Sequence, residues 1–424
     1  MEKLTKLEKQ WVLYDVGNSA FVMLTSTVIP IYFKNLASAA GVSLADSTAY
    51  WSYAASLCTL IVAFLGPILG AMADTRGFRK PFFVACLLLG VVGCVLLSVP
   101  VGYVMFLVVY VLAKIGLTGS FVFYDSMLGD VTEDARMDVV SSQGYAWGYI
   151  GSCIPFTACL LLILTADGTG LGAAGATMVS FWITGLWWVA MALPLVRNYR
   201  QRHYVHRGRH LVRESFARIA RSLKDFRGQK HILLFLLAFF FYIDGVYTII
   251  DLATSYGKDV GIGDTHLLLA LLLTQVVAFP CSLWFAKISK RTQTHKLIEV
   301  CIVGYIFITL FALQLDKAWE FWFLAVCVAV FQGAIQALSR SYFARIIPKE
   351  KSSEYFGFFD IFGKGAAFMG TLLVGLSTQL SGTSKMGVAL IPVLFLLGWW
   401  LLRRAVKLAE QVRAQETADP LSRG

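Results

Sequence analysis

A few charged and amide side chains interrupt the long apolar stretches of this sequence. A charge inside a hydrocarbon layer costs several kcal/mol, so it almost always faces a cavity or a partner. Groups in that position can bind a polar solute and can carry a proton or another ion. The residues concerned are Asp15, Asn18, Lys114, Asp244, Gln332, Gln336, Asp360 and Lys364.

The spacing of these residues places several of them on shared helical faces. Asp15 and Asn18 are three positions apart, and Gln332, Gln336 and Arg340 follow one another at intervals of four. Such intervals return to the same side of an α-helix. We therefore expect a solute site formed by Asp15, Asn18, Lys114, Asp244, Gln332 and Gln336.

The opposite charges in this set indicate how the site would work. We expect Lys114 to face a carboxylate or another anionic group of the solute, and Asp244 or Asp15 to face an amine. A carboxylate that is removed from water takes up a proton more readily. The expected ion-coupling residues are Asp15, Asp244, Asp360 and Lys364, with a proton or sodium as the coupling ion.

Each of these residues also has a structural alternative. Asp15 could pair with the loops near its helix end, and Asp360 could form an internal pair with Lys364, four positions on. Gln332 and Gln336 could instead form hydrogen bonds between helices.

Signals for covalent chemistry are missing. The eight cysteines all lie in apolar stretches without a CxxC pair, which is typical of small buried hydrophobic residues. We find no glycine-framed nucleophilic serine, and the six histidines lie in loops or at the ends of apolar stretches. His203, His206 and His210 lack cysteines or carboxylates at matching spacing, which favours a solvated basic loop over a metal site. We expect a protein that is not an enzyme, with no catalytic residue, cofactor or metal.

Long apolar segments must hold these residues in place. Of the 424 residues, 57% are apolar and 15% are charged, and the mean hydropathy is +0.67. These values exclude soluble, disordered and coiled-coil proteins. Because one helical span needs about 20 residues, we expect an all-α polytopic membrane protein with twelve transmembrane helices, at 11–33, 49–73, 81–99, 101–124, 142–165, 173–196, 231–252, 265–286, 297–315, 319–346, 355–380 and 386–402.

Lysine and arginine set the expected orientation. With the N-terminus inside, the cytoplasmic segments hold 31 of the 37 Lys and Arg residues, and the outer loops hold four. This bias predicts a multi-pass protein of the cell (inner) membrane with both termini in the cytoplasm. The same distribution explains the net charge of +11, so no nucleic acid is expected as a partner.

One long connection separates the first six spans from the last six. It carries eleven Lys and Arg against two acidic residues. Apolar residues recur at helical spacing from Val212 to Phe226, which predicts a basic amphipathic helix lying on the anionic lipids of the inner leaflet. A helix packed under the bundle is the alternative. The expected parts are a six-helix bundle at 1–196, this linker at 197–230, a second bundle at 231–402 and a cytoplasmic tail at 403–424.

Two short loops repeat one another. The loop after the second span reads GAMADTRGFRK (70–80), and AKISKRTQTHK (286–296) has the same place after the eighth. The first copy resembles the signature loop of the major facilitator superfamily. The resemblance implies two pseudo-symmetric six-helix halves and a gating role for this loop, with its aspartate near the cytoplasmic start of span eleven. The gating residues expected are Gly70, Asp74, Arg76, Gly77, Arg79 and Lys80, together with Asp125 and Arg340 as gate ion pairs at the cytoplasmic ends of spans four and ten.

Further stretches resemble one branch, the vacuole-effluxer-like transporters related to the fungal vacuolar amino-acid effluxer. They include WVLYDVGNSAF (11–21), FYIDGVYTI (241–249) and GAIQALSRSYFARIIP (333–348). The resemblance implies a monomeric secondary active transporter of a small polar or zwitterionic solute, amino-acid-like, that works by alternating access. The alternative is a lipid or lysolipid flippase on the same fold. The many aromatic residues permit a flippase, whereas the charges inside the spans oppose it.

Overall fold

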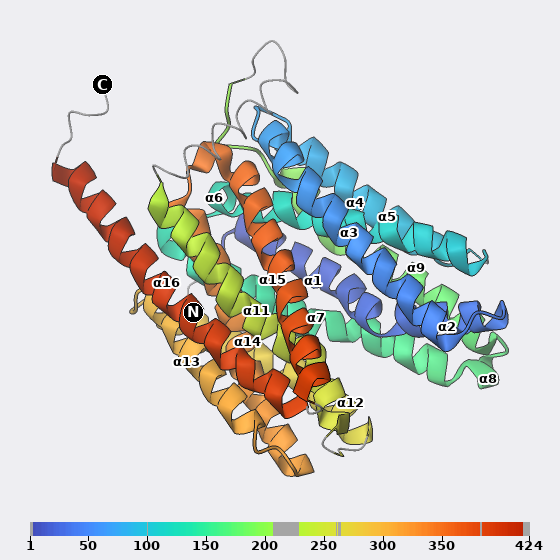
Figure 1. The fold of residues 1–424 in the computed structure, drawn as a ribbon. Helices are drawn as coiled ribbons and strands as arrows, with labels where there is room; N and C mark the ends of the chain where they lie inside the picture. The colour runs from blue at the N-terminus through green and yellow to red at the C-terminus, as the bar shows by residue number, and fades with distance from the viewer. Residues whose placement is uncertain are drawn as a thin grey trace. The chain divides into compact units, whose positions relative to one another are not determined.

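The computed structural model describes residues 3–99, 101–206, 229–259, 261, 264–381 and 384–418. This part of the chain is a succession of helices without a strand (Figure 1), so the expectation of an all-α protein is confirmed. The helices before the linker are α1 (Lys6–Ser26), α2 (Val28–Ala39), α3 (Leu44–Ala73), α4 (Arg79–Leu96), α5 (Tyr103–Ser126), α6 (Leu128–Val131), η1 (Asp134–Arg136), α7 (Met137–Leu164), α8 (Ala166–Thr169) and α9 (Gly172–Asn198). Those after it are α11 (Lys230–Asp259), α12 (Asp264–Ile288), α13 (Thr294–Ala312), α14 (Ala318–Ile346), η2 (Lys349–Lys351), α15 (Ser352–Ser381) and α16 (Ser384–Ala418).

Ten helical stretches among the described residues are long and apolar enough to cross a membrane. One of them, Lys6–Ala39, joins α1 and α2. Two shorter apolar stretches, Leu272–Ile288 and Leu372–Ser381, lie in α12 and α15. Together these stretches are consistent with the twelve predicted spans, and the chain is a multi-pass membrane protein by length and composition.

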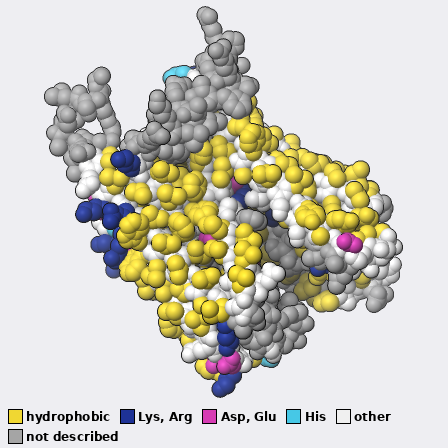
Figure 2. Space-filling model, in the orientation of Figure 1, with side chains coloured by type: hydrophobic (Ala, Val, Ile, Leu, Met, Phe, Trp, Pro, Cys, Tyr) yellow, Lys and Arg dark blue, Asp and Glu magenta, His cyan; other side chains and the backbone are white. Residues whose placement is uncertain are grey.

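The outer surface of the helices is apolar. Leu60 and Phe64 of α3 and Leu164 of α7 are 68%, 70% and 73% exposed. Figure 2 shows hydrophobic side chains spread widely over the visible face. A soluble protein rarely exposes apolar surface on this scale, so lipid is the solvent that suits these helices.

The first helix begins at a side-chain cap. Thr5 Oγ1 accepts the backbone N–H of Glu8 at 3.2 Å, and Glu8 Oε2 accepts the backbone N–H of Thr5 at 2.7 Å. This reciprocal pair satisfies two backbone donors that a helix start would otherwise leave unbonded. Glu8 Oε1 also accepts the hydroxyl of Thr132 at 2.6 Å, which fixes the start of α1 beside the residue that follows α6.

The chain divides into two compact units. Unit 1 consists of Met1–Glu133, Gln143–Val212 and Lys349–Gly357, and unit 2 consists of Asp134–Ser142, Arg213–Pro348 and Phe358–Gly424. Each unit therefore includes a short segment from beyond the linker boundary, namely the start of α15 in unit 1 and the start of α7 in unit 2.

The two units repeat one packing scheme. In unit 1, α1 packs against α9, and α5 packs against both α3 and α4. In unit 2, α11 packs against α16, and α14 packs against both α12 and α13. The first helix of each unit thus pairs with the sixth, and the fourth pairs with the second and third. This equivalence agrees with the internal repeat in the sequence.

Part of the linker lies outside the described residues. The predicted amphipathic helix from Val212 to Phe226 falls within 207–228, as does His210. Residues 199–206 are described and lie against the loop between α3 and α4, as set out below.

Candidate functional site

Asp244 is the most deeply buried of the carboxylates predicted to bind solute. It lies in the middle of α11 and is fully buried. Its Oδ1 accepts the backbone N–H of Gly370 at 2.8 Å and the hydroxyl of Thr248 at 3.4 Å. Its Oδ2 has no hydrogen-bond partner among the described residues. One oxygen of this carboxyl group is therefore held by α15 and α11, and the other is available.

The close approach of α15 to Asp244 requires a glycine. A methyl group at position 370 would lie 2.2 Å from Asp244 Oδ1 and 2.0 Å from Thr248 Oγ1. Real side-chain carbons do not approach oxygens so closely, so a larger residue would push α15 away from the carboxyl group. Gly370 is thus part of the site, although a glycine in the sequence gives no sign of a chemical function.

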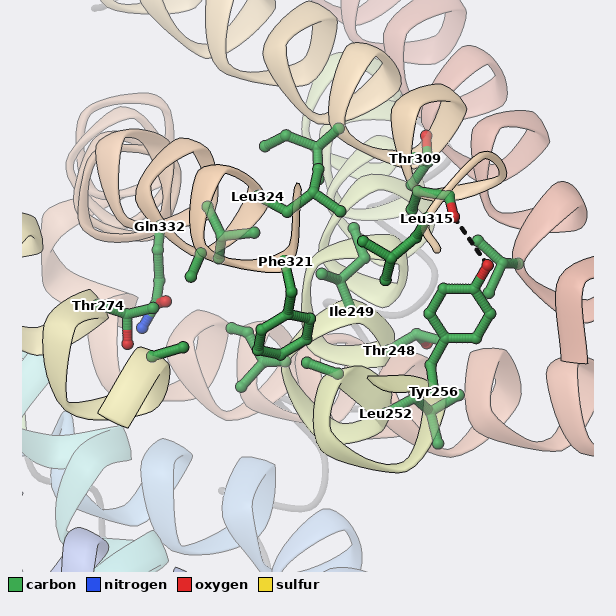
Figure 3. Close-up of a pocket in the computed structure, with 18 of the residues that line it drawn as sticks. Thr248, Ile249, Leu252, Tyr256, Thr274, Thr309, Leu315, Phe321, Leu324 and Gln332 are labelled. Carbon is green, nitrogen blue, oxygen red and sulfur yellow. Dashed lines mark hydrogen bonds between the residues drawn. The ribbon is translucent and has the colours of Figure 1, made fainter. Parts of the chain in front are cut away.

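Gln332 and Thr248 line the same cavity in unit 2, which has a volume of about 130 Å³. Figure 3 shows Gln332 beside Thr274 at one end of this cavity and Tyr256 at the other. Gln336, by contrast, donates its side-chain N–H to the backbone oxygen of Gln332 at 3.0 Å. Of the two glutamines, Gln332 is the one that contributes to a cavity wall.

Asp15 and Asn18 occur together on α1 in unit 1. Asn18 Nδ2 donates to the backbone oxygen of Tyr14 at 3.0 Å and to Asp15 Oδ1 at 3.4 Å. Both side chains are buried. The expected proximity of these two residues on one helical face is therefore present.

Lys114 lies on α5 in the same unit, at a different height along α1 from Asp15. Its Nζ donates to Thr25 Oγ1 at 3.4 Å. Thr25 is ten residues beyond Asp15 on α1, which corresponds to about 15 Å along a helix axis. Within unit 1, the amine of Lys114 and the carboxyl group of Asp15 thus lie at different levels along α1.

Asp360 and Lys364 form an ion pair on α15. Both side chains are largely removed from solvent, and they are one helical turn apart. Each charge therefore offsets the other within the helix, which is the arrangement of the internal-pair alternative.

The loop 70–80 surrounds the start of α15 inside unit 1. Asp74 Oδ1 accepts the backbone N–H of Ser353 at 2.8 Å, and Asp74 Oδ2 accepts that of Glu354 at 2.9 Å. The carboxylate thus satisfies two of the free N–H groups at a helix N-terminus, where negative charge is favourable. A methyl group at Gly70 would lie 2.3 Å from the carbonyl oxygen of Ser353, so glycine is required for this approach.

Arg79 links Asp74 to a second carboxylate. Its guanidinium donates to Asp74 Oδ1 and to Asp130 Oδ2, both at 2.7 Å, and to Ser353 Oγ at 2.8 Å. All three charged side chains are about 1% exposed. A buried charge is tolerated when it is paired and hydrogen-bonded, and this cluster meets both conditions.

Other residues of the loop occupy its outer side. Gly77 has φ of +81°, a conformation that glycine adopts without strain. Arg76 stacks on the ring of Tyr204 at 5.3 Å. Lys80, at the start of α4, is half-buried.

Residues 199–206 form a strap over this loop. Val205 N–H donates to Asp74 O at 2.8 Å, and Arg76 N–H donates to Val205 O at 3.1 Å. Gln201 accepts the N–H of Gly77 at 2.9 Å. The beginning of the linker is therefore an ordered part of unit 1, joined to the loop through backbone hydrogen bonds.

The strap also completes the surroundings of Asp130. Tyr199 donates its hydroxyl to Asp130 Oδ2 at 2.5 Å, and both the backbone N–H and Nδ1 of His203 lie within 3.0 Å of Asp130 Oδ1. Burial on its own would raise the pKa of the Asp130 carboxyl group. The hydrogen bonds from His203 and Tyr199 and the charge of Arg79 outweigh it, so the pKa of Asp130 is lowered from its usual value.

A second carboxylate cluster lies in unit 2. Asp138, near the start of α7, accepts hydrogen bonds from Thr294 at 2.5 Å and from the hydroxyl of Ser341, and it forms an ion pair with Arg345. Arg340 donates instead to the hydroxyl and the backbone oxygen of Ser141, at 2.9 and 3.1 Å. Asp125 is half-buried at the end of α5 in unit 1.

Several residues in these clusters were not singled out from the sequence. Asp130 follows the fourth span and Asp138 lies at the start of the fifth. Acidic residues are common at such positions and indicate no specific function. Tyr199 and His203 belong to a basic loop whose composition is typical of a solvent-exposed linker. Among the described residues, no group of three metal-ligating side chains is present, and the described histidine His203 contacts a carboxylate.

Comparisons with known proteins agree with this architecture. The family model for vacuole effluxer Atg22-like proteins matches residues 5–416. An MFS-type transporter, YxiO of Bacillus subtilis, is 43% identical over 403 residues, covering 94% of each chain. Autophagy-related protein 22 of Coccidioides immitis is 23% identical, covering 83% of this chain and 71% of its own.

Solved structures share the fold at low sequence identity. The major facilitator FucP in an outward conformation has a TM-score of 0.71 at 14% identity, covering 94% of this chain and 97% of its own. A bacterial homologue of ferroportin, outward-facing, has a TM-score of 0.70 at 13% identity, with 95% and 98% covered. These matches support the helical architecture described above.

Proposed function

Since the chain belongs to the Atg22-like vacuole effluxer family of the major facilitator superfamily, we propose that it carries a small polar or zwitterionic organic solute by alternating access, driven by protons that bind at Asp244. Secondary transport is the activity that its relatives support. An amino-acid-like solute, the proton and the role of Asp244 are the proposed refinements.

The free oxygen of Asp244 is the observation that carries proton coupling. A fully buried carboxylate without a cationic partner is costly in its charged form. Among the described residues, no Lys, Arg or His forms an ion pair with Asp244. A proton on Oδ2 removes that cost, and its release on the other side of the membrane would complete a coupling cycle.

The helices around Asp244 favour a proton over sodium. Transporters that bind sodium commonly use the carbonyl oxygens of a broken helix. Here α11 is one continuous helix from Lys230 to Asp259, and the neighbouring group on α15 is the N–H of Gly370, a donor. An N–H donor and a continuous helix provide no carbonyl oxygens to coordinate a metal cation. Oδ2 of Asp244 remains available to bind a proton.

Charges of both signs support a zwitterionic solute. Lys114 can contact a carboxylate, and Asp244 or Asp15 can contact an amine. The ion pair of Asp360 with Lys364 is already neutral within α15, so we propose that it holds the helix and contributes less to coupling. Gln332 lines the cavity next to Thr248 and can add a hydrogen bond.

The two carboxylate clusters are the proposed gating elements. Asp74 holds the start of α15, a helix that continues in unit 2, and Asp138 lies at the start of α7, a helix that continues in unit 1. Breaking either cluster frees one helix start, as alternating access demands. From the lysine and arginine bias we propose that both clusters and both termini lie on the cytoplasmic side.

A ligand screen followed by transport assays tests this proposal. Purified protein is first screened for thermal stabilisation by amino acids, peptides, sugars and lysolipids. Proteoliposomes with a pH gradient then accumulate the stabilising solute. Asp244→Asn should abolish accumulation driven by the pH gradient, because the proton site is lost.

Asp316→Asn is the matched control, since the side chain of Asp316 is 71% exposed and pairs with Lys385. It should accumulate solute like the unmodified protein. Accumulation by Asp244→Asn at the unmodified rate would refute proton coupling at Asp244. Stabilisation by lysolipids alone would favour the flippase alternative.

A further inference from the structure

The cavity in unit 2 lies inside one bundle of helices. Its walls come from α11, α12, α13, α14 and α16, and its volume is about 130 Å³. Figure 3 shows Phe321 and Leu324 of α14 and Ile249 and Leu252 of α11 among the residues around it. The lining is mostly aliphatic and aromatic carbon.

Three hydroxyl groups in the wall are already bonded within the protein, and Thr274, Gln275 and Gln332 are the other polar residues of the lining. Tyr256 donates to the backbone oxygen of Ala312 at 2.7 Å, and Thr309 donates to that of Ile306 at 2.8 Å. Thr248 donates to Asp244. Water needs two to four polar partners to stay in a cavity. Thr248, Tyr256 and Thr309 have used their donors within the protein, so the mostly carbon-lined part of the cavity around them suits an apolar occupant better than water.

The helices of unit 1 that correspond to three of these helices carry aromatic side chains. There the first, second and fourth helical spans contribute an aromatic cluster. Tyr32 packs on Phe106 at 5.5 Å, Phe33 on Trp51 at 5.7 Å, and Trp51 on Tyr110 at 4.3 Å between ring centroids. The corresponding helices of unit 2 provide the small residues Ala270 and Ala325 to the cavity wall, together with Phe321.

We infer that the cavity of unit 2 binds a ring-sized apolar group. A dry cavity of about 150 Å³ lined by Leu, Ile and Phe takes up benzene, so a volume of about 130 Å³ suits a ring or a branched alkyl group. The group is either part of the transported solute or a separate hydrophobic molecule. Binding itself does not depend on the proposed transport.

The position of the cavity gives the occupant a route to the proposed proton site. Thr248 forms part of the cavity wall, and its hydroxyl also contacts Asp244 Oδ1. An occupant that packs against Thr248 is therefore separated from the carboxyl group of Asp244 only by the side chain of Thr248.

A benzene titration monitored by methyl NMR tests the inference. The protein is labelled at the isoleucine δ1 methyl groups, because Ile249, Ile308 and Ile391 all line the cavity. We expect these three signals to shift and to saturate with benzene. Ile29 of α2, fully buried in unit 1, is the internal reference and should not shift.

Two variants fill the cavity and one matched variant does not. Ala325→Leu and Ala312→Leu each add three carbon atoms to the wall, on α14 and α13, and should weaken benzene binding at least tenfold. Leu390→Phe adds a ring to an exposed position of α16 next to Ile391 and should leave binding unchanged. Two filling variants are used so that one that fails to fold does not remove the test.

Two results would overturn the inference. One is a shift that rises linearly and equally at Ile29 and at the cavity, which means partitioning into detergent. The other is saturable binding that survives in a folded filling variant. Displacement of benzene by the transported solute would assign the apolar group to that solute, and simultaneous binding would assign it to a separate molecule; the site stands in either case.

Discussion

Units 1 and 2 share a helix packing scheme but differ in what fills them. Unit 1 contains an aromatic cluster at one level and the buried charges of Arg79, Asp74 and Asp130 under the strap 199–206 at another. Unit 2 contains a carboxyl oxygen without a described partner at Asp244 and an apolar cavity of about 130 Å³. The comparison teaches that two halves with one helix packing scheme can place their buried polar groups and their internal space differently.

The two carboxylate clusters differ in which element carries the carboxylate. In unit 1 the carboxylate Asp74 belongs to the loop and caps the start of α15. In unit 2 the carboxylate Asp138 belongs to the start of α7 and receives Thr294 from the loop. A polar cavity of about 260 Å³, lined by Lys290, Asp138 and Glu410 among others, lies beside the second loop. The first loop carries the strap instead.

Removing Arg79 should have the largest effect on stability. Arg79→Met leaves Asp74 and Asp130 buried without their shared cation, and breaking a buried pair costs about 3–5 kcal/mol. Thermal unfolding of the purified protein measures the loss. Lys80→Met, a neighbouring half-buried lysine outside the cluster, is the control and should change stability little.

The equivalent change in unit 2 should cost less. In Arg345→Met, Asp138 keeps the hydroxyl donors Thr294 and Ser341, and the Arg345 side chain is 22% exposed. We expect a loss of about 1–2 kcal/mol in the same unfolding assay, after allowing for solvent screening. Equal losses for both arginine variants would contradict the proposed difference between the clusters.

Exchanging the small residues of the two loops tests how tightly each is packed. Gly70→Ala places a methyl group against the backbone of Ser353 and should cost about 1–3 kcal/mol through overpacking. The second loop already has Ala286 at this place. Ala286→Gly should therefore cost only the helical penalty of glycine, about 0.5–1 kcal/mol, in thermal unfolding. A larger loss for Ala286→Gly than for Gly70→Ala would reverse the ranking.

The smallest expected effect is a pH dependence that belongs to unit 1. Because the pKa of Asp130 is lower in the folded protein, its contribution to stability is complete above the unfolded pKa of about 3.9 and disappears as the pH falls through the folded value. The contribution of Asp130 to the melting temperature should therefore stay constant from pH 6 to about pH 4 and decrease as the pH falls further. The drop of the melting temperature should be shallower in Asp130→Asn, and an unchanged slope would exclude this carboxylate as its source.

The sequence predicted the helices well because membrane spans are long, apolar and continuous. Asp244, Lys114 and Gln332 were also found from the sequence, since polar groups inside apolar runs stand out. Gly370 was not found, because its contribution is a backbone N–H and the lack of a side chain. Tyr199 was missed and His203 was assigned to a solvated loop, because their hydrogen bonds to Asp130 depend on the tertiary position of the strap.

Lys114 illustrates what spacing cannot provide. Its type and depth were readable from the sequence, but its contact with Thr25 depends on how α5 lies against α1. Distances between side chains of different helices follow from packing, and helical periodicity specifies only which residues share a face.

Proton counting during solute binding is the most direct test of the central claim, that Asp244 is the coupling site. The stabilising solute is added to purified protein in weakly buffered detergent solution, and a pH-sensitive dye reports protons taken up or released. We predict about one proton exchanged per bound solute in the unmodified protein, as for a single titrating carboxyl group, and none in Asp244→Asn. The same proton count in an Asp244→Asn variant that still binds solute would contradict the account.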